Sequence, residues 1–192
     1  MIREVNKEEV NPFAKSIEYI EDNKVIYEIK TLGLNNHSDH LLPLIEEGLQ
    51  KHNLQVKDFD KIILGVGPGA YTGLRVSMSV AKMFSWTLNI PLYVISSLDL
   101  LTSGYKEDGL YVTCLKAKKG FVYHKAFEIK QGVKQVIQDD SFVSDDYINN
   151  YQNEYKLINN ENMLVDSLNL KENELKLVNN VHALEPNYLR ES

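Results

Sequence analysis

The chain has 192 residues and a mass of 22.0 kDa, and its 43% hydrophobic and 25% charged residues exclude a wholly disordered protein. A net charge of −6 argues against a free-standing nucleic-acid binder, because phosphate contacts need clustered Lys and Arg. The single cysteine, Cys114, excludes an internal disulfide and a cysteine zinc cluster, which suits a reducing cytoplasm. Residues 1–15 lack the apolar core of a signal peptide, and no apolar run approaches the roughly 18 residues that span a bilayer. We therefore expect a soluble, cytoplasmic protein that contacts no membrane.

Strands and helices alternate along the first part of the chain, which predicts an α/β fold. Residues 25–29 are typical of a strand, and residues 16–20 are a candidate hairpin partner across the turn at 21–24. A helix is expected to begin near Ser38, whose hydroxyl can cap it. An apolar stripe at helical spacing follows, made of Leu41, Leu42, Leu44, Ile45 and Leu49.

The next segment predicts a βαβ unit. Residues 62–66 form a short apolar run of the kind found in buried parallel strands, and the glycine-rich turn at 67–69 follows. A long helix is expected over residues 72–88, with Thr72 or Gly73 near its cap, before a strand at 92–95.

The pattern changes beyond residue 101. Two strands are expected at 110–115 and 121–128, joined by a basic turn. The Asn- and Asp-rich region that follows predicts a short helix after Ser144 and a short strand at 155–158.

The segment from residue 65 to residue 75 places a glycine-rich loop before a helix, where backbone N–H groups and the helix dipole can receive an anion such as phosphate. It has no Gly-Lys-[Ser/Thr] and misses the Gly-x-Gly-x-x-Gly register, so the pattern favours a structural turn over a phosphate cradle. For Arg75, which lies early in the expected helix, a position on the surface is favoured over a role as an anion ligand. The candidate residues are Gly67, Gly69, Thr72, Gly73 and Arg75.

Other chemical candidates are weaker. His37 and His40 are three residues apart but have no third ligand, so we expect no metal site. Cys114 lies within an expected apolar strand, where a thiol is usually inert, and the chain has no Gly-x-Ser-x-Gly nucleophile elbow.

The helix expected over 72–88 is apolar on more than one side. One stripe runs through Leu74, Met78, Ala81 and Leu88, and Trp86 lies elsewhere. Such a helix is either sandwiched within its own domain or packed at a subunit interface, for which Trp and Met are favoured. Periodicity does not separate these two interpretations.

Seven segments, in order along most of the chain, resemble the TsaB (YeaZ) family. The most specific is 65–75, Gly-Val-Gly-Pro-Gly-Ala-Tyr-Thr-Gly-Leu-Arg. The others are 36–45 (Asn-His-Ser-Asp-His-Leu-Leu-Pro-Leu-Ile), 81–82 (Ala-Lys), 89–91 (Asn-Ile-Pro), 96–99 (Ser-Ser-Leu-Asp), 117–123 (Ala-Lys-Lys-Gly-Phe-Val-Tyr) and 185–190 (Glu-Pro-Asn-Tyr-Leu-Arg).

The resemblance implies an actin-like ATPase (ASKHA) fold with two small ribonuclease-H-like lobes and a mixed sheet flanked by helices. Residues 1–101 would form the N-terminal lobe with the glycine-rich loop and the interface helices, and residues 102–192 a smaller C-terminal α/β lobe. The family normally opens with an apolar strand that ends in Ile-Asp-Thr-Ser, whereas residues 1–15 here are charged and have no such aspartate.

The implied role is that of a non-catalytic dimerisation subunit in making threonylcarbamoyladenosine beside the anticodon of tRNAs that read codons beginning with A. The chain would pair with the catalytic subunit TsaD, and the ATPase TsaE would join them. The chain would contact tRNA only as part of this complex. ATP and metal are expected on these partners and no cofactor on this chain. Whether the chain forms a homodimer when alone is left open. We place the partner interface at Leu41, Leu42, Ile45, Leu49, Leu74, Met78, Ala81 and Lys82.

Two other functions remain as alternatives. An ATP-using enzyme of the same fold would place Gly67, Gly69, Thr72 and Gly73 around phosphate, but it needs a carboxylate to hold Mg²⁺, and the N-terminal candidate is missing. The older label for such sequences, glycoprotease or M22 peptidase, has no supporting nucleophile or metal ligands here. The sequence thus favours an accessory subunit over an enzyme.

Overall fold

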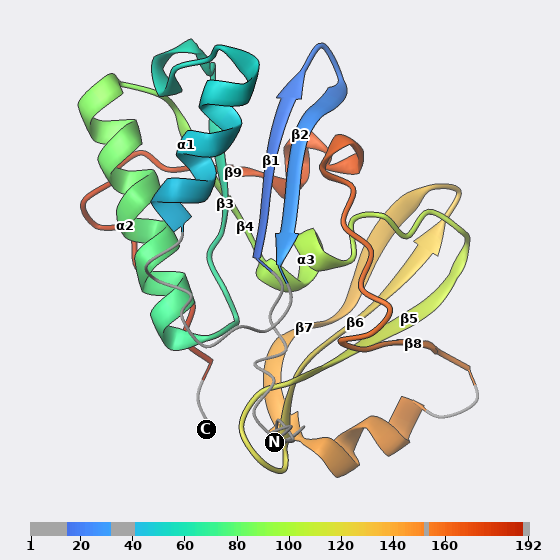
Figure 1. Cartoon of the computed structure of the whole chain (residues 1–192). Coiled ribbons are helices and arrows are strands. Elements are labelled where there is room, and N and C mark those ends of the chain that lie inside the picture. Colours follow the sequence, from blue (N-terminus) through green and yellow to red (C-terminus); the bar gives the residue numbers. More distant parts are fainter. Residues whose placement is uncertain (1–14, 32–40, 152–153, 190–192) are drawn as a thin grey trace, which may run out of the picture.

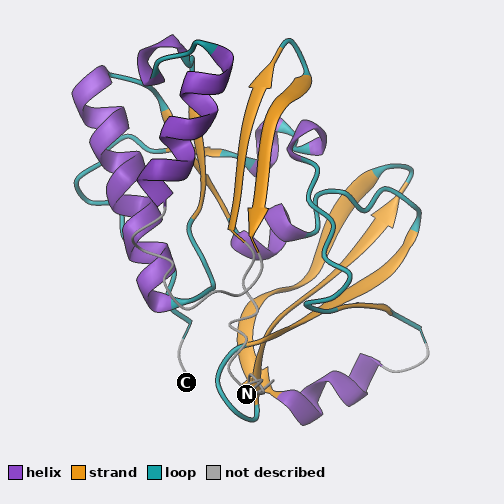
Figure 2. Ribbon diagram, viewed as in Figure 1, coloured by secondary structure: helices purple, strands orange, loops and turns teal. Residues whose placement is uncertain are grey.

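The computed structural model of the protein describes residues 15–31, 41–151 and 154–189. Helices and short strands from the first half of the chain pack together, and a separate four-stranded sheet is built from the second half (Figures 1 and 2). This mixed α/β architecture, with sheets flanked by helices, confirms the predicted fold class.

The described chain opens with the expected β-hairpin. Strands β1 (Lys15–Glu21) and β2 (Lys24–Thr31) pair antiparallel. The two turn residues between them, Asp22 and Asn23, have φ angles of 48° and 58°. Asp and Asn tolerate this left-handed region, and the turn twist that results suits a two-residue hairpin loop.

Helix α1 (Leu41–His52) packs against this hairpin and is followed by a short 3₁₀ helix, η2 (Val56–Asp58). The Tyr19 hydroxyl donates to the carbonyl oxygen of Ile45 at 2.6 Å, and the Tyr27 hydroxyl donates to that of Leu44 at 3.2 Å. The predicted apolar stripe therefore lies on a helix. The expected cap Ser38, together with His37 and His40, lies outside the described residues.

The βαβ prediction is confirmed. Strands β3 (Ile62–Gly65) and β4 (Leu92–Ile95) are parallel and joined by α2 (Tyr71–Leu88), and β9 (Lys176–Leu177) pairs antiparallel with β4. The helix begins one residue earlier than expected and its N-cap is Ala70, so Thr72 and Gly73 lie in its first turn. Asn89 ends it in the left-handed conformation, with φ of 57°. The core beneath it contains Leu64, Met78, Ala81, Leu92 and Val94.

The four-stranded sheet has the order β7-β6-β5-β8. Strands β5 (Gly109–Lys116) and β6 (Phe121–Lys130) are the predicted antiparallel pair, and β8 (Lys156–Ile158) is the predicted short strand. The short helix expected after Ser144 is the 3₁₀ helix η3 (Asp145–Tyr151). The elements that were not predicted include the short helix α3 (Ser97–Leu101), the edge strand β7 (Val133–Ser144) and the two-residue β9.

After two more 3₁₀ helices, η4 (Ser167–Asn169) and η5 (Glu172–Glu174), the chain returns to its first half. Val178, Val181 and Leu184 pack against the core beneath α2. The division into two lobes at residue 101 stays a prediction. None of the helices in the described ranges has the length and apolar character that a bilayer crossing requires.

Candidate functional site

The glycine-rich loop between β3 and α2 is held on two sides by its own chain. The Gly67 N–H donates to Ser97 Oγ at 2.9 Å, and the Ser97 N–H donates back to the Gly67 carbonyl at 2.8 Å. On the other side, the Asn187 N–H donates to the carbonyl of Val66 at 2.8 Å. Gly67 has φ of 115°, and a Cβ atom there would lie 2.6 Å from the Asn187 carbonyl oxygen, so only glycine fits.

These contacts give the loop a structural role. The Gly67 N–H already donates a hydrogen bond to Ser97, so it is not free for a ligand. A Cβ atom on Gly69 would be in contact with the Leu74 side chain. The Tyr123 hydroxyl, from the four-stranded sheet, reaches the Gly69 carbonyl at 3.5 Å. The loop is thus the point where β3, α3 and the C-terminal segment meet, and phosphate binding there stays a prediction.

Arg75 packs against the Tyr71 side chain in the first turns of α2. Its guanidinium carbon lies 5.1 Å from the centre of the Tyr71 ring and its Nη1 donates to the Tyr71 hydroxyl. The Tyr71 ring stacks in turn on Tyr188, with ring centres 5.1 Å apart. Thr72 is exposed and Gly73 faces open space. Tyr71 therefore joins the start of α2 to the C-terminal segment, and Arg75 packs on the Tyr71 ring.

The stripe of α2 that was predicted to meet a partner is turned into the chain's own core. Leu74, Met78 and Ala81 are only 8%, 4% and 6% exposed. For these three residues the structure shows burial within the chain itself, one of the two alternatives left open, whereas Leu88 at the end of the stripe is 42% exposed. The Lys82 ammonium group also has partners within the chain: its Nζ donates to the carbonyl oxygens of His182 and Leu184, both at 3.0 Å.

On α1 the predicted interface residues divide between the core, a groove and the surface. Leu41 is buried, whereas Leu42 is exposed. Ile45 and Leu49 are half-buried and line an apolar groove that α1 shares with α2 and β3. Of these four side chains, only that of Leu42 is open enough to reach a partner without rearrangement.

The outer face of α2 carries apolar side chains that the interface prediction did not include. Met83 and Trp86 are exposed, and Trp86, at 67%, is the most exposed large hydrophobic residue in the described part of the chain. Its indole meets the His182 ring edge-on, with centres 5.2 Å apart. We call Met83 and Trp86, with the neighbouring His182, the outer α2 surface. In the sequence, Trp86 lies off the apolar stripe of this helix, and that position is the signal that could have identified it.

A buried charge cluster joins α3 to the four-stranded sheet and was not predicted. Lys125 on β6, whose side chain is 3% exposed, lies 2.7 Å from Asp99 Oδ2 and 3.1 Å from Asp140 Oδ1. Lys134 on β7 binds the other oxygen of Asp99 at 2.7 Å, and the Ser96 hydroxyl donates to Asp140 at 2.6 Å. Ser96 and Asp99 belong to a family-like segment, but nothing in the sequence indicates their partners.

The cluster shifts the pKa values of its members in different directions. Burial alone would raise the pKa of Asp99, but Lys134 and Lys125 outweigh it and hold that pKa below its ordinary value. Burial does raise the pKa of Asp140, against the opposing effects of Ser96 and Lys125. Burial would lower the pKa of Lys125, but the two carboxylates raise it overall. Lys125 thus stays charged, and the cluster acts as a structural tie.

Nucleophilic and metal chemistry find little support in the described residues. Burial, with a smaller contribution from Asp145, raises the pKa of the Cys114 thiol, which keeps it protonated and unreactive. His124 Nδ1 lies 3.0 Å from Ser141 Oγ, but His124 Nε2 is buried without a hydrogen-bond partner. No group of three or more His, Cys, Asp or Glu side chains within the described ranges is arranged to hold a metal ion.

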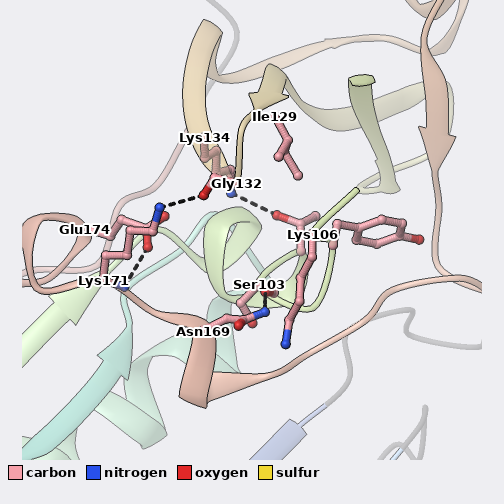
Figure 3. Close-up of a pocket in the computed structure, with 10 residues that line it drawn as sticks. Ser103, Lys106, Ile129, Gly132, Lys134, Asn169, Lys171 and Glu174 are labelled. Atoms are coloured by element: carbon pink, nitrogen blue, oxygen red, sulfur yellow. Dashed lines mark hydrogen bonds between the residues drawn. The ribbon is translucent and has the colours of Figure 1, made fainter. Parts of the chain in front are cut away.

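A cavity of about 220 Å³ lies between the end of α3, the β6–β7 turn and the η4–η5 region (Figure 3). Three lysines line it, but each ammonium group already contacts an oxygen of the chain. Lys106 pairs with Asp166 at 3.0 Å, and Lys171 donates to the Gly132 carbonyl at 2.7 Å. Lys134 belongs to the charge cluster. The described residues that line this cavity therefore offer no free cation to an anionic ligand.

The family model described as TsaD, tRNA N6-adenosine threonylcarbamoyltransferase, matches residues 31–184. The tRNA threonylcarbamoyladenosine biosynthesis protein TsaB of Bacillus subtilis (strain 168) is 32% identical over 138 residues, 71% of this chain and 60% of that protein. The TsaB protein of Buchnera aphidicola subsp. Schizaphis graminum (strain Sg) is 34% identical over 104 residues, 52% of this chain and 49% of that protein. The chain thus spans about half to 60% of the length of these relatives.

Two solved structures share the fold. YeaZ from Pseudomonas aeruginosa superposes with a TM-score of 0.61 and 22% identity, covering 68% of this chain and 62% of that one. A structure described as an uncharacterized protein with similarity to peptidase YEAZ from Pseudomonas aeruginosa gives a TM-score of 0.72 with 18% identity, covering 92% and 94%. At these identities the likeness concerns the fold alone.

Proposed function

This chain belongs to the TsaB (YeaZ) family, and from that premise we propose that it takes part in the biosynthesis of threonylcarbamoyladenosine in tRNA. Its role is that of a non-catalytic subunit that pairs with a TsaD-like catalytic subunit. The names of the curated relatives support the process, and the outer α2 surface supports the pairing.

The outer α2 surface is the observation that carries the proposal. A tryptophan that is 67% exposed, with an exposed methionine three residues before it, costs hydration free energy in an isolated chain. Trp is also the residue type most enriched among side chains that dominate binding free energy. The stripe of Leu74, Met78 and Ala81 is already buried, so a partner that packs on α2 contacts the outer α2 surface. Leu42 on α1 is a further contact candidate, whereas Leu74, Met78 and Ala81 would support the helix from beneath.

The remaining parts of the proposal follow the family. A TsaE-like ATPase joins the two subunits. The chain contacts tRNA only as part of this complex, and the complex acts in the cytoplasm. The net charge of −6 supports a chain that does not hold tRNA by itself. We also propose that nucleotide and metal are bound by the partner subunits and not by this chain.

The test is light scattering on a sizing column, with the chain alone and then mixed with the TsaD-like protein of the same organism. We expect a stable mixed complex that Trp86→Ala weakens by about tenfold to a hundredfold, the range of a binding hot spot. Val136→Ala, which shortens an apolar side chain on β7 that is 54% exposed, is the control and should leave affinity unchanged. The run with the chain alone also shows whether it forms a homodimer.

Two outcomes would contradict the proposal. No complex with the wild-type chain would overturn the pairing itself. A complex that Trp86→Ala and Val136→Ala affect equally would move the contact away from the outer α2 surface. A reconstituted tRNA modification assay completes the test, since threonylcarbamoyladenosine should form only when this chain is present.

A further inference from the structure

The outer α2 surface is built from two segments that are far apart in the sequence. Met83 and Trp86 belong to α2, whereas His182 comes from a turn at 181–184, in the segment that follows β9 and passes beside α2 (Figure 1). The Trp86 indole meets the His182 ring edge-on, with ring centres 5.2 Å apart. The shape of the surface therefore depends on how this turn is held on the helix.

Lys82 holds the turn from the helix side. Its Nζ donates to the carbonyl oxygens of His182 and Leu184, both at 3.0 Å. Lysine side chains bind carbonyl oxygens in the same way at the ends of helices. The Asn180 side-chain oxygen accepts the N–H groups of His182 and Ala183 at 3.1 and 3.3 Å. Side chains from two segments thus bind the donors and acceptors of this turn and fix its backbone.

Apolar packing and helical spacing determine where the turn lies. Val181 and Leu184 are half-buried and pack against the core beneath α2, while His182 between them is exposed. Lys82 and Trp86 are four residues apart in α2, and side chains at that spacing lie one above the other on one face of a helix. The turn that Lys82 binds is therefore brought to the place where its imidazole reaches Trp86.

We propose that Lys82 is a positioning residue for the pairing with a TsaD-like subunit, because it places His182 against Trp86 and so builds the surface that the partner contacts. This inference rests on the proposed function. The prediction from the sequence placed Lys82 in the contact itself, whereas here it acts from behind the surface.

The physical basis is preorganisation of the surface. Without the ammonium group, two carbonyl oxygens of the turn lose a charge-assisted donor, and the turn is able to leave the helix. Trp86 then loses its ring partner and gains rotamer freedom. The partner would have to order both segments on binding, and this ordering costs affinity although no contact with the partner has been removed.

The first test uses the emission of Trp86, which is the only tryptophan in the chain. A protonated imidazole in contact with an indole quenches its fluorescence, and histidines take up a proton between about pH 8 and about pH 5. We expect the wild-type emission to fall across this range and His182→Gln to abolish the fall. Lys82→Met should reduce the fall by at least about half, whereas Lys82→Arg keeps a charged donor for two carbonyls and should retain most of it.

The second test is affinity for the TsaD-like subunit. Lys82→Met should weaken binding by at least about tenfold, and His182→Gln by about threefold to tenfold. Lys119→Met makes the same change as Lys82→Met at an exposed position of the β5–β6 turn and should leave binding unchanged. Because Lys82 and His182 act through one contact, the variant that combines their two changes should bind within about twofold of Lys82→Met alone.

Amide exchange shows whether Lys82→Met acts on the turn alone. Exchange in segment 180–185 should be faster than in the wild type, while exchange in β3 and β4 should be unchanged. Circular dichroism establishes that the variants fold. If Lys82→Met does not fold, the wild-type emission profile, Lys82→Arg and His182→Gln still test the ring contact and its effect on affinity.

The proposal is overturned if the wild-type emission does not respond to pH, or if the fall is the same in Lys82→Met as in the wild type. Wild-type affinity in Lys82→Met would show that the position of the turn does not matter for docking. Additive losses in Lys82→Met and His182→Gln would show that the two side chains act separately. Absence of any complex with the wild-type chain would overturn the pairing and this role with it. The emission profile distinguishes these failures, because it needs no partner.

Discussion

The Ser96 hydroxyl donates a 2.6 Å hydrogen bond to Asp140 Oδ2, and this bond ties the start of α3 to the edge strand β7. The same hydroxyl accepts the Leu98 N–H at 3.1 Å and so caps α3. One side chain therefore begins a helix in one half of the molecule and binds a carboxylate in the other. The next residue, Ser97, accepts a hydrogen bond from the Gly67 N–H, so the glycine-rich loop is attached to the same end of α3.

Ser96→Ala should lower the free energy of unfolding by about 1–2 kcal/mol, because both the cap and the bond to Asp140 are lost. It should also raise the pKa of Asp140 further, since the Ser96 hydroxyl now opposes the effect of burial. Denaturant unfolding and carboxyl NMR titration measure the two effects. A double-mutant cycle with Asp140→Asn separates them, and a coupling energy near zero would show that only the cap matters.

Lys125→Met should lower the free energy of unfolding by about 3–5 kcal/mol, because it removes the ammonium group that faces a buried carboxylate. Asp99 keeps Lys134 as a partner, so the uncompensated charge is that of Asp140, whose side chain is 8% exposed. Adding Asp140→Asn to Lys125→Met should therefore recover at least half of the loss. Lys119→Met, at an exposed position of the β5–β6 turn, is the control and should change little.

The His124 imidazole should make the chain less stable as the solution becomes mildly acidic. Burial lowers the pKa of His124 to about 4, below its ordinary value of 6.5. Between these pH values the unfolded chain takes up a proton that the folded chain refuses, so stability falls as pH falls from about 6.5 to about 4. Below that window both states are protonated and this contribution stops changing.

Replacing His124 by Gln should remove this part of the pH dependence, on the order of 2 kcal/mol across the window. Thermal unfolding at several pH values between 4 and 7 measures it. The same change at the exposed His182 is the control and should leave the slope as in the wild type. An unchanged slope in His124→Gln would mean that other groups dominate acid sensitivity here.

The elements that sequence reasoning predicted are those specified by nearby residues. The β1–β2 hairpin follows from Asp22 and Asn23, which tolerate a left-handed turn, and the βαβ unit follows from an apolar run and a glycine-rich turn. Strand β7 was missed because it lies at a sheet edge and buries none of its residues fully, so it shows no clear alternation.

The site was harder to predict, because its properties depend on contacts between distant segments. Lys125 has the pattern of an exposed basic residue, and its burial follows from Asp99 and Asp140, which belong to α3 and β7. Periodicity identified the stripe of Leu74, Met78 and Ala81 but not what covers it, and the chain's own sheet does. The likeness to a family supplied the function, while the exposed Trp86 had to be seen in the fold.

Two helical glycines should respond in opposite ways to replacement by alanine. A Cβ on Gly48 of α1 would overlap the Tyr27 ring and lie 2.7 Å from Tyr19 Cε2, whereas a Cβ on Gly73 of α2 meets nothing within 4 Å. Alanine is favoured over glycine within a helix by up to about 1 kcal/mol. Gly73 lies in the first turn of α2, where this preference is smaller than in the helix interior, so only part of the gain should appear as added stability.

At Gly48 the overlap should outweigh the gain, because both tyrosine hydroxyls are anchored to carbonyls of α1 and their rings cannot move away freely. We expect Gly48→Ala to lower the free energy of unfolding by about 1–3 kcal/mol. Amide exchange should also quicken in β1 and β2, since α1 is displaced from the hairpin. Denaturant unfolding of the two variants checks the contrast, and equal stabilisation by both would show that α1 and the hairpin are not in close contact in solution.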